Sequence, residues 1–139
     1  MTPEPQPNGL TRLVLVSHSA TLAEGLAELV GQVAGSEVSI HAIGGAGDGS
    51  LGTDGGRVLR ALEESADGTG TVVIMDIGSS VLAVRAGLGE LEPEVLKKVF
   101  VADAPLVEGA LAAAVTASTG APPDVVANAA EEARNARKL

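Results

Sequence analysis

Short apolar runs alternate along the chain with segments whose apolar residues are spaced three or four apart. A continuous apolar run is typical of a strand buried on both faces, and the wider spacing is typical of a helix with one buried side. The runs predict strands at residues 13–16, 38–43, 71–75 and 99–102. The spacing predicts helices at residues 20–34, around 58–62, and at 81–88, 106–119 and 125–138.

Strands that alternate with helices predict a three-layer α/β sandwich, with a central, mostly parallel sheet of about four to five strands flanked by helices. The length of 139 residues suits a single domain, which we expect to span residues 12–138. Residues 1–11 contain three prolines and predict a disordered lead-in. Thr53 or Asp54 is expected to cap the second helix, and Asp124 the last one.

Composition narrows the possible partners and chemistry. The formal net charge of −9 argues against nucleic acid and anionic membrane surfaces, because both need a basic patch. The chain has no cysteine, which excludes disulfides and thiol chemistry. No apolar stretch approaches the roughly 20 residues of a membrane span, and the first nine residues lack the apolar core of a signal peptide. We therefore expect a cytoplasmic protein.

The polar residues best suited to chemistry follow the predicted strands. Right-handed crossovers place the carboxyl ends of parallel strands at one edge of the sheet, where α/β proteins bind their ligands. This edge is predicted to carry Ser17-His18-Ser19, the glycine-rich loop 44–54, the segment 76–80 and Asp103. Their concentration at one edge predicts the functional site.

His18 and Asp76 follow two different strands, so their side chains can meet although they lie far apart in the sequence. A carboxylate that bonds one imidazole nitrogen fixes the tautomer and makes the other nitrogen a better nucleophile or base. Asp76 has a second interpretation as the cap of the following helix, and the two roles are compatible. His18 could also be a structural loop residue. His41, the other histidine, is expected to face solvent or a neighbouring helix from within its strand.

Gly78, Ser79 and Ser80 follow at a predicted strand-to-helix turn. Free backbone N–H groups and hydroxyls at such a turn bind anions, although serine is equally typical of an ordinary helix start. The glycine-rich loop is a weaker signal, because it matches neither phosphate-binding fingerprint. A nucleotide-binding site is therefore disfavoured.

Other site chemistries lack the residues they require. His18, Asp76 and Asp54 are too few ligands to predict a metal site, and no cofactor is expected. No Gly-x-Ser-x-Gly elbow surrounds Ser17 or Ser19, so a hydrolase is not predicted. A histidine nucleophile beside an anion-binding turn favours transient phosphorylation of the imidazole ring.

Three segments resemble proteins of the bacterial phosphotransferase system (PTS). Residues 14–19, with 23–25 behind them, resemble the opening of mannose-type enzyme IIA domains. Residues 49–54 and 73–80 resemble two later motifs of DhaM-type subunits, the phosphoryl carriers of PTS-dependent dihydroxyacetone kinases. Sugar-transporter relatives carry a Gly-Gly-Ser-Pro type turn after the aspartate, and the Gly-Ser-Ser turn here fits the DhaM type better. The likeness covers about residues 11–135.

The resemblance implies a homodimeric phosphoryl carrier. In that family the histidine at the position of His18 receives a phosphoryl group from phospho-HPr, and the resemblance suggests its Nε2 as the acceptor. The group passes to ADP on the DhaL subunit, which then phosphorylates dihydroxyacetone on DhaK. The aspartate at the position of Asp76 orients the imidazole. The residues expected to hold the phosphoryl group are Gly78, Ser79, Ser80 and Thr53.

Several alternatives stay open. The chain could be an enzyme IIA domain that passes phosphoryl groups to a IIB component of a sugar permease, or a regulatory module in which phosphorylated His18 is a signal. It could also be a small-ligand binding domain built on the glycine-rich loop. Some DhaM proteins carry HPr-like and enzyme I-like domains after this one, and the sequence leaves this open. The alanine-rich helices at 106–119 or 125–137 could supply a dimer interface.

Overall fold

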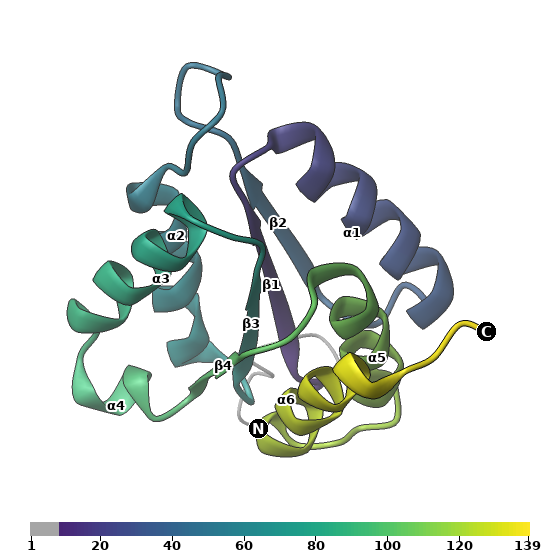
Figure 1. The fold of residues 1–139 in the computed structure, drawn as a ribbon. Coiled ribbons are helices and arrows are strands. Elements are labelled where there is room, and N and C mark those ends of the chain that lie inside the picture. Colours follow the sequence, from purple (N-terminus) through teal and green to yellow (C-terminus); the bar gives the residue numbers. More distant parts are fainter. Residues whose placement is uncertain (1–8) are drawn as a thin grey trace.

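Four parallel strands form the central sheet of the protein, in a computed structural model that describes residues 9–139 (Figure 1). The strands are β1 (Arg12–Ser17), β2 (Ile40–Gly44), β3 (Thr71–Met75) and β4 (Val99–Ala102). Their order in the sheet is β2-β1-β3-β4. In the register, Leu15 of β1 lies between Ala42 of β2 and Ile74 of β3. The α/β fold and its parallel sheet are as predicted from the sequence.

Helices cover both faces of this sheet and complete the three-layer sandwich (Figure 1). One face packs against α1 (Ala20–Ala34), α5 (Leu106–Ser118) and α6 (Pro123–Glu132). The other face packs against α2 (Gly55–Glu63) and α3 (Ser79–Gly89), with the short α4 (Pro93–Leu96) beside them. Two 3-10 turns, η1 (Glu64–Asp67) and η2 (Ala133–Asn135), follow α2 and α6.

Strand β1 forms the centre of the core. Leu13 and Leu15 belong to the apolar cluster on the α1 side, whereas Val14 and Val16 belong to the cluster on the α2 side. All four are at most 1% exposed. Burial on both faces explains why this strand reads as a continuous apolar run. The strand therefore holds the residue that follows it, His18, on a rigid support.

Small side chains allow α5 and α6 to pack closely on the sheet and on each other. Ala110, Ala113, Ala114 and Ala117 of α5 are fully buried, as is Ala130 of α6. The alanine faces considered above for a dimer interface are therefore covered within the protomer.

Several local predictions were wrong. β2 begins at Ile40 rather than at residue 38. The structure also contains a helical turn that was not predicted, α4, before β4, because Pro93 with its fixed φ suits the first helical position. α6 already begins at Pro123, so Asp124 lies in its first turn and does not cap it. The helix ends at Glu132, short of the predicted residue 138.

The predicted lead-in lies mostly outside the described residues, since residues 1–8 are not among them. Thr11, at its end, is fully buried, and its hydroxyl donates a hydrogen bond of 3.0 Å to the carbonyl of Ala121. The hydroxyl of Thr69 donates to the carbonyl of Gly9. Within residues 9–139, every helix is too short or too polar to cross a membrane.

Candidate phosphoryl-transfer site

The structure brings His18 and Asp76 together at the carboxyl edge of the sheet. His18 follows β1 and Asp76 follows β3, and these strands are neighbours. Nδ1 of His18 lies 2.7 Å from Oδ2 of Asp76. The His18 side chain is 37% exposed, whereas that of Asp76 is 9% exposed. The carboxylate is thus held inside the edge while the imidazole reaches solvent.

Five donor groups surround the Asp76 carboxylate. Oδ2 accepts from Ser17 Oγ at 2.8 Å, from His18 N at 3.1 Å and from His18 Nδ1. Oδ1 accepts from Ile77 N and Ser80 Oγ, both at 2.6 Å. Desolvation raises the pKa of this carboxyl, but the hydrogen bonds, led by those from Ser80 and Ser17, outweigh it and lower the pKa to about 2. Asp76 is therefore ionised at neutral pH.

The ionised carboxylate determines the tautomer of His18. A carboxylate only accepts hydrogen bonds, so Nδ1 of a neutral His18 carries the ring proton. The lone pair then remains on Nε2, the nitrogen that is free to act as a nucleophile. Asp76 also opposes rotation of the ring. The pair therefore presents one defined nitrogen at the edge of the sheet.

The turn after Asp76 leaves two backbone donors free. Gly78 is the N-cap residue of α3 and has φ of 60°, a conformation that favours glycine. The backbone N–H groups of Gly78 and Ser79 make no hydrogen bond to any described residue. Two free N–H groups at the start of an 11-residue helix suit an anion. Asp76 lies two residues before the N-cap position, so it does not cap α3 as the alternative interpretation proposed.

Thr53 reaches this turn from the glycine-rich loop. Its Oγ1 lies 2.8 Å from Ser79 Oγ and 3.4 Å from Ser80 Oγ. Ser79 is partly exposed, whereas Ser80 is fully buried and its hydroxyl donates to Asp76. Of the four residues predicted to hold an anion, Gly78, Ser79 and Thr53 border the open side. The contacts of Ser80 instead hold Asp76 in place.

Ser17 is a positioning residue that the sequence reasoning did not assign. Its side chain is buried, its hydroxyl donates to Asp76, and the same oxygen accepts from the backbone N–H of Ser19 at 3.0 Å. Ser19 in turn caps α1 by accepting from the N–H of Leu22. The signal in the sequence was the serine on each side of His18, placed between a strand and a helix.

Two glycines of the adjoining loop support the backbone of the histidine. The N–H of Gly52 donates to the carbonyl of His18 at 2.9 Å. Gly44 lies against Ser19, the residue after His18, and a Cβ added to Gly44 would lie 2.4 Å from the carbonyl oxygen of Ser19. The loop ends at Asp54, which caps α2 as one of the two predicted alternatives. Glycine is therefore required at position 44 because the backbone of Ser19 approaches it closely. A single sequence does not reveal such an approach.

Exposed aliphatic side chains lie on the segments that form this site. Leu51 precedes Gly52 in the supporting loop, Ile77 follows Asp76, and Leu82 lies in the first turn of α3. They are 72%, 68% and 68% exposed, respectively. Several exposed aliphatic residues around one reactive group are typical of a protein-docking surface.

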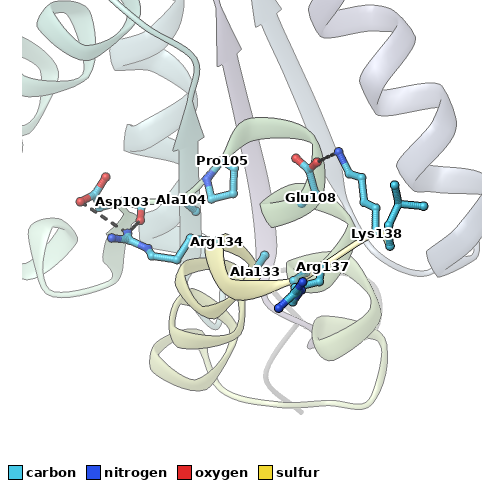
Figure 2. A pocket seen from close by; sticks show the side chains of 10 residues that line it. Asp103, Ala104, Pro105, Glu108, Ala133, Arg134, Arg137 and Lys138 are labelled. Carbon is cyan, nitrogen blue, oxygen red and sulfur yellow. Dashed lines mark hydrogen bonds and ion pairs between the residues drawn. The ribbon is translucent and has the colours of Figure 1, made fainter.

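Asp103 was expected at the same edge, but it has different partners. Its carboxylate lies 3.5 Å from Arg134, which also donates to its carbonyl, and its N–H donates to Glu131. Figure 2 shows Arg134 reaching Asp103 beside an open pocket of about 740 Å³, where Lys138 also pairs with Glu108. None of the residues that line this pocket belongs to the His18 site. Within residues 9–139, no cluster of three His, Asp or Glu residues could hold a metal ion.

The sequence model of the EIIA-man family, described as PTS system fructose IIA component, matches residues 12–127. The chain belongs to this family. This chain, a member of a family of PTS components, therefore carries a histidine with an oriented ring at the open edge of its sheet. The chain is also similar to a solved structure, that of a protein of unknown function, EF1359, which superposes with a TM-score of 0.80 at 34% sequence identity. The match covers 94% of this chain and 97% of that one.

Relatives of this EIIA-man chain include proteins named as subunits of dihydroxyacetone kinases. It is 41% identical over 103 residues to the phosphoryl donor subunit DhaM of PEP-dependent dihydroxyacetone kinase 2 from Listeria innocua, covering 74% of this chain and 82% of that subunit. It is 35% identical over 109 residues to the phosphotransferase subunit DhaM of the PTS-dependent kinase from Lactococcus lactis, covering 78% and 84%.

A longer relative shares the same region. The DhaM subunit of Escherichia coli is 41% identical over 132 residues, which is 93% of this chain. The chain spans only 28% of the length of that subunit.

Proposed function

We propose that this chain is the phosphoryl carrier of a PTS-dependent dihydroxyacetone kinase. His18 accepts a phosphoryl group from phospho-HPr and passes it to ADP bound on a DhaL subunit. The ATP so formed then phosphorylates dihydroxyacetone on DhaK, in the cytoplasm. The names of the relatives, phosphoryl donor subunits of such kinases, support this assignment.

The observation that carries the proposal is the 2.7 Å contact between His18 Nδ1 and Asp76 Oδ2. It leaves the lone pair on Nε2, which attacks the phosphorus of the donor phosphohistidine while the P–N bond to the donor breaks. The ring then carries a phosphoryl group on Nε2 and a proton on Nδ1. The Asp76 carboxylate offsets the positive charge that develops on this ring.

The return step uses the same geometry in reverse. A β-phosphate oxygen of ADP attacks the phosphorus, the P–Nε2 bond breaks, and the electron pair returns to Nε2. The free N–H groups of Gly78 and Ser79, with the hydroxyl of Thr53, are suited to stabilise the phosphoryl oxygens during both steps. Neither step requires a metal or an organic cofactor on this chain.

The exposed aliphatic residues around His18 fit the need of a carrier to contact two proteins in turn. A donor and an acceptor must each bring a phosphorus atom to Nε2, and neither can remain bound. Leu51, Ile77 and Leu82 provide exposed apolar side chains for such contacts. A few side chains of this kind suit short-lived complexes.

A second candidate function keeps the same chemistry with another acceptor. The family model is described as a IIA component of a PTS fructose system, which favours transfer to a IIB component. A regulatory role of phosphorylated His18 would involve labelling without support of dihydroxyacetone turnover. The acceptor therefore distinguishes these functions, while His18 is common to them.

The proposal includes a homodimer, as the family resemblance implies. The buried alanines of α5 and α6 are covered within the protomer, so an interface would use outward residues such as Val107 and Val115 of α5, which are 40% and 46% exposed. Sedimentation equilibrium tests this, and a mass of a single chain at micromolar concentration would contradict it.

The decisive experiment is a transfer assay with purified components. Enzyme I, HPr and radiolabelled phosphoenolpyruvate should label the wild-type chain on an acid-labile group, and DhaL with ADP should then discharge it. His18→Gln should remain unlabelled while its melting curve stays cooperative. A chain that is labelled but discharged only by a IIB protein would favour the second candidate, and labelling of His18→Gln would refute both.

A further inference from the structure

Positive charge gathers beside the edge strand β2, in a chain whose net charge is −9. Arg57 and Arg60 of α2 line an open pocket of about 440 Å³ together with residues of β2. Arg12 of β1 contacts two of the residues that line the pocket. Its Nη2 is 3.2 Å from Nε2 of His41 and 2.9 Å from Oε1 of Glu64, and both of these residues line the pocket. Glu64 is the only acid among the residues that line this pocket, so the group is net positive.

Arg12 is incompletely neutralised where it lies. Its side chain is 5% exposed, and its Nη1 is buried without a hydrogen-bond partner among the described residues. Its one carboxylate partner, Glu64, is 59% exposed and therefore a weak counter-charge. A buried guanidinium with an unused donor is costly, and such a group calls for an explanation, of which a bound water or ion is one.

His41 belongs to the wall of the pocket. Burial lowers the pKa of His41, and the charge of Arg12 lowers it further against the opposing effect of Glu64. The ring is therefore neutral at pH 7. Arginine only donates, so Nε2 of His41 accepts from Arg12, and the ring proton lies on Nδ1. The hydroxyl of Ser39 lies 3.1 Å from the same Nε2.

The two arginines of α2 are available to a ligand. The side chain of Arg60 makes no hydrogen bond or ion pair with any described residue, and the side chain of Arg57 makes only a long contact of 3.4 Å from Nη1 to the carbonyl of Gly44. Three residues apart on one helix, their side chains lie on the same face. Guanidinium groups match the oxygen spacing of phosphate and bind it through paired hydrogen bonds.

We infer that this pocket, formed by β2 and α2 with Arg57, Arg60 and His41, binds a phosphate dianion. The dianion is either free inorganic phosphate or the phosphate group of a small phosphomonoester. The pocket volume suits a small molecule rather than a long chain segment. The site uses none of the groups that act on the phosphoryl group at His18, so it is a second anion site and does not depend on the proposed carrier function.

Residue-resolved NMR tests the site directly. The full ¹⁵N-labelled chain is titrated at pH 7.5 and constant ionic strength with sodium phosphate, with glycerol 3-phosphate and with sodium chloride. We expect saturable shifts of backbone amides in residues 40–43 and 57–61 with both phosphates and not with chloride. Equal affinity for the two would identify free phosphate as the ligand, and tighter binding of glycerol 3-phosphate would identify a phosphomonoester. Shifts in residues 77–80 report separately on the His18 site.

Matched variants should change the affinity for phosphate in opposite directions. Arg60→Gln should weaken binding about tenfold, because it removes a charged donor. Glu64→Gln should tighten binding a few fold, because it removes the one negative charge among the residues that line the pocket. Arg85→Gln, on an exposed arginine of α3 outside the pocket, should leave the affinity unchanged.

Two results would overturn the inference. One is a set of shifts that fails to saturate, or that is the same in Arg60→Gln as in wild type. The other is a set of shifts produced by hexaglutamate and by neither phosphate, which would identify the edge strand as a docking site for an acidic peptide.

Discussion

The two histidines of this protein have opposite partners, and the contrast explains why one is suited to chemistry. His18 has a carboxylate at Nδ1, at 2.7 Å, whereas His41 has a guanidinium at Nε2, at 3.2 Å. The carboxylate fixes a proton on Nδ1 and leaves the Nε2 lone pair free. The guanidinium instead occupies the Nε2 lone pair of His41.

Position in the sheet adds to this contrast. His18 lies beyond the carboxyl end of β1, next to free N–H groups at the start of α3. His41 lies within β2, where burial and Arg12 lower its pKa. A partner of the opposite charge thus gives the same side chain a different role, and the predictions below separate the two roles.

The largest effect is expected from removing the charge of Asp76. Asp76→Asn should slow phosphoryl transfer to His18 by about 100-fold, because the amide no longer fixes the tautomer or offsets the charge on the ring. Rapid-quench labelling with phospho-HPr measures this rate. Asp103→Asn is the matched control, an aspartate at the end of β4 that pairs with Arg134 instead. Equal rates in the two variants would remove Asp76 from the mechanism.

A methyl group added at Gly44, where the end of β2 lies against Ser19, should destabilise the fold. Gly44→Ala places a Cβ 2.4 Å from the carbonyl oxygen of Ser19, so the backbone must shift, at a cost of about 2 kcal/mol. Gly25→Ala, in α1 with no atom within 4 Å of the new Cβ, should instead stabilise by about 0.5 kcal/mol. Urea unfolding gives both values, and a neutral Gly44→Ala would show that the close approach is relaxed in solution.

Replacing His41 should affect stability through Arg12. His41→Leu removes an acceptor from a buried guanidinium and should cost about 1–2 kcal/mol. His41→Gln keeps an acceptor oxygen in reach of Arg12 and should recover part of this loss. Denaturant unfolding of the two variants is the measurement. An equal loss in both would mean that the ring is held by packing and not by its bond to Arg12.

The smallest expected effect is on the free energy of unfolding at acid pH. The pKa of Asp76 is lowered from 3.8 to about 2 in the folded protein, so between these values the unfolded chain binds a proton that the folded one does not. The stabilisation is complete above pH 4–5 and is lost as the pH falls toward 2, by about 1 kcal/mol after allowance for solvent screening. The gap in unfolding free energy between wild type and Asp76→Asn should therefore narrow from pH 5 to pH 2.5. A constant gap would contradict the low pKa.

The sequence predicted the elements that depend on local chemistry. The apolar run of β1 reflects burial on both faces, and the cap at Asp54, one of two predicted alternatives, is a local side chain to backbone bond. The meeting of His18 with Asp76 followed from the rule that parallel strands end at one edge.

The remaining features depend on contacts between distant residues. Arg12 meets His41 because the register of β1 and β2 sets Val14 opposite His41. Gly44 is required by the backbone of Ser19, which packs against it from another element. Neither relation leaves a periodic or local signal in a single sequence, so both needed the structure.

The nitrogen that carries the phosphoryl group tests the central claim most directly. The chain is labelled with ¹⁵N at histidine, phosphorylated with enzyme I, HPr and phosphoenolpyruvate, and observed by two-bond ¹H–¹⁵N correlation of the rings. The His18–Asp76 geometry predicts a phosphoryl group on Nε2 of His18, with Nδ1 still protonated and the His41 signals unchanged. A phosphoryl group on Nδ1 of His18, or on His41, would contradict the account.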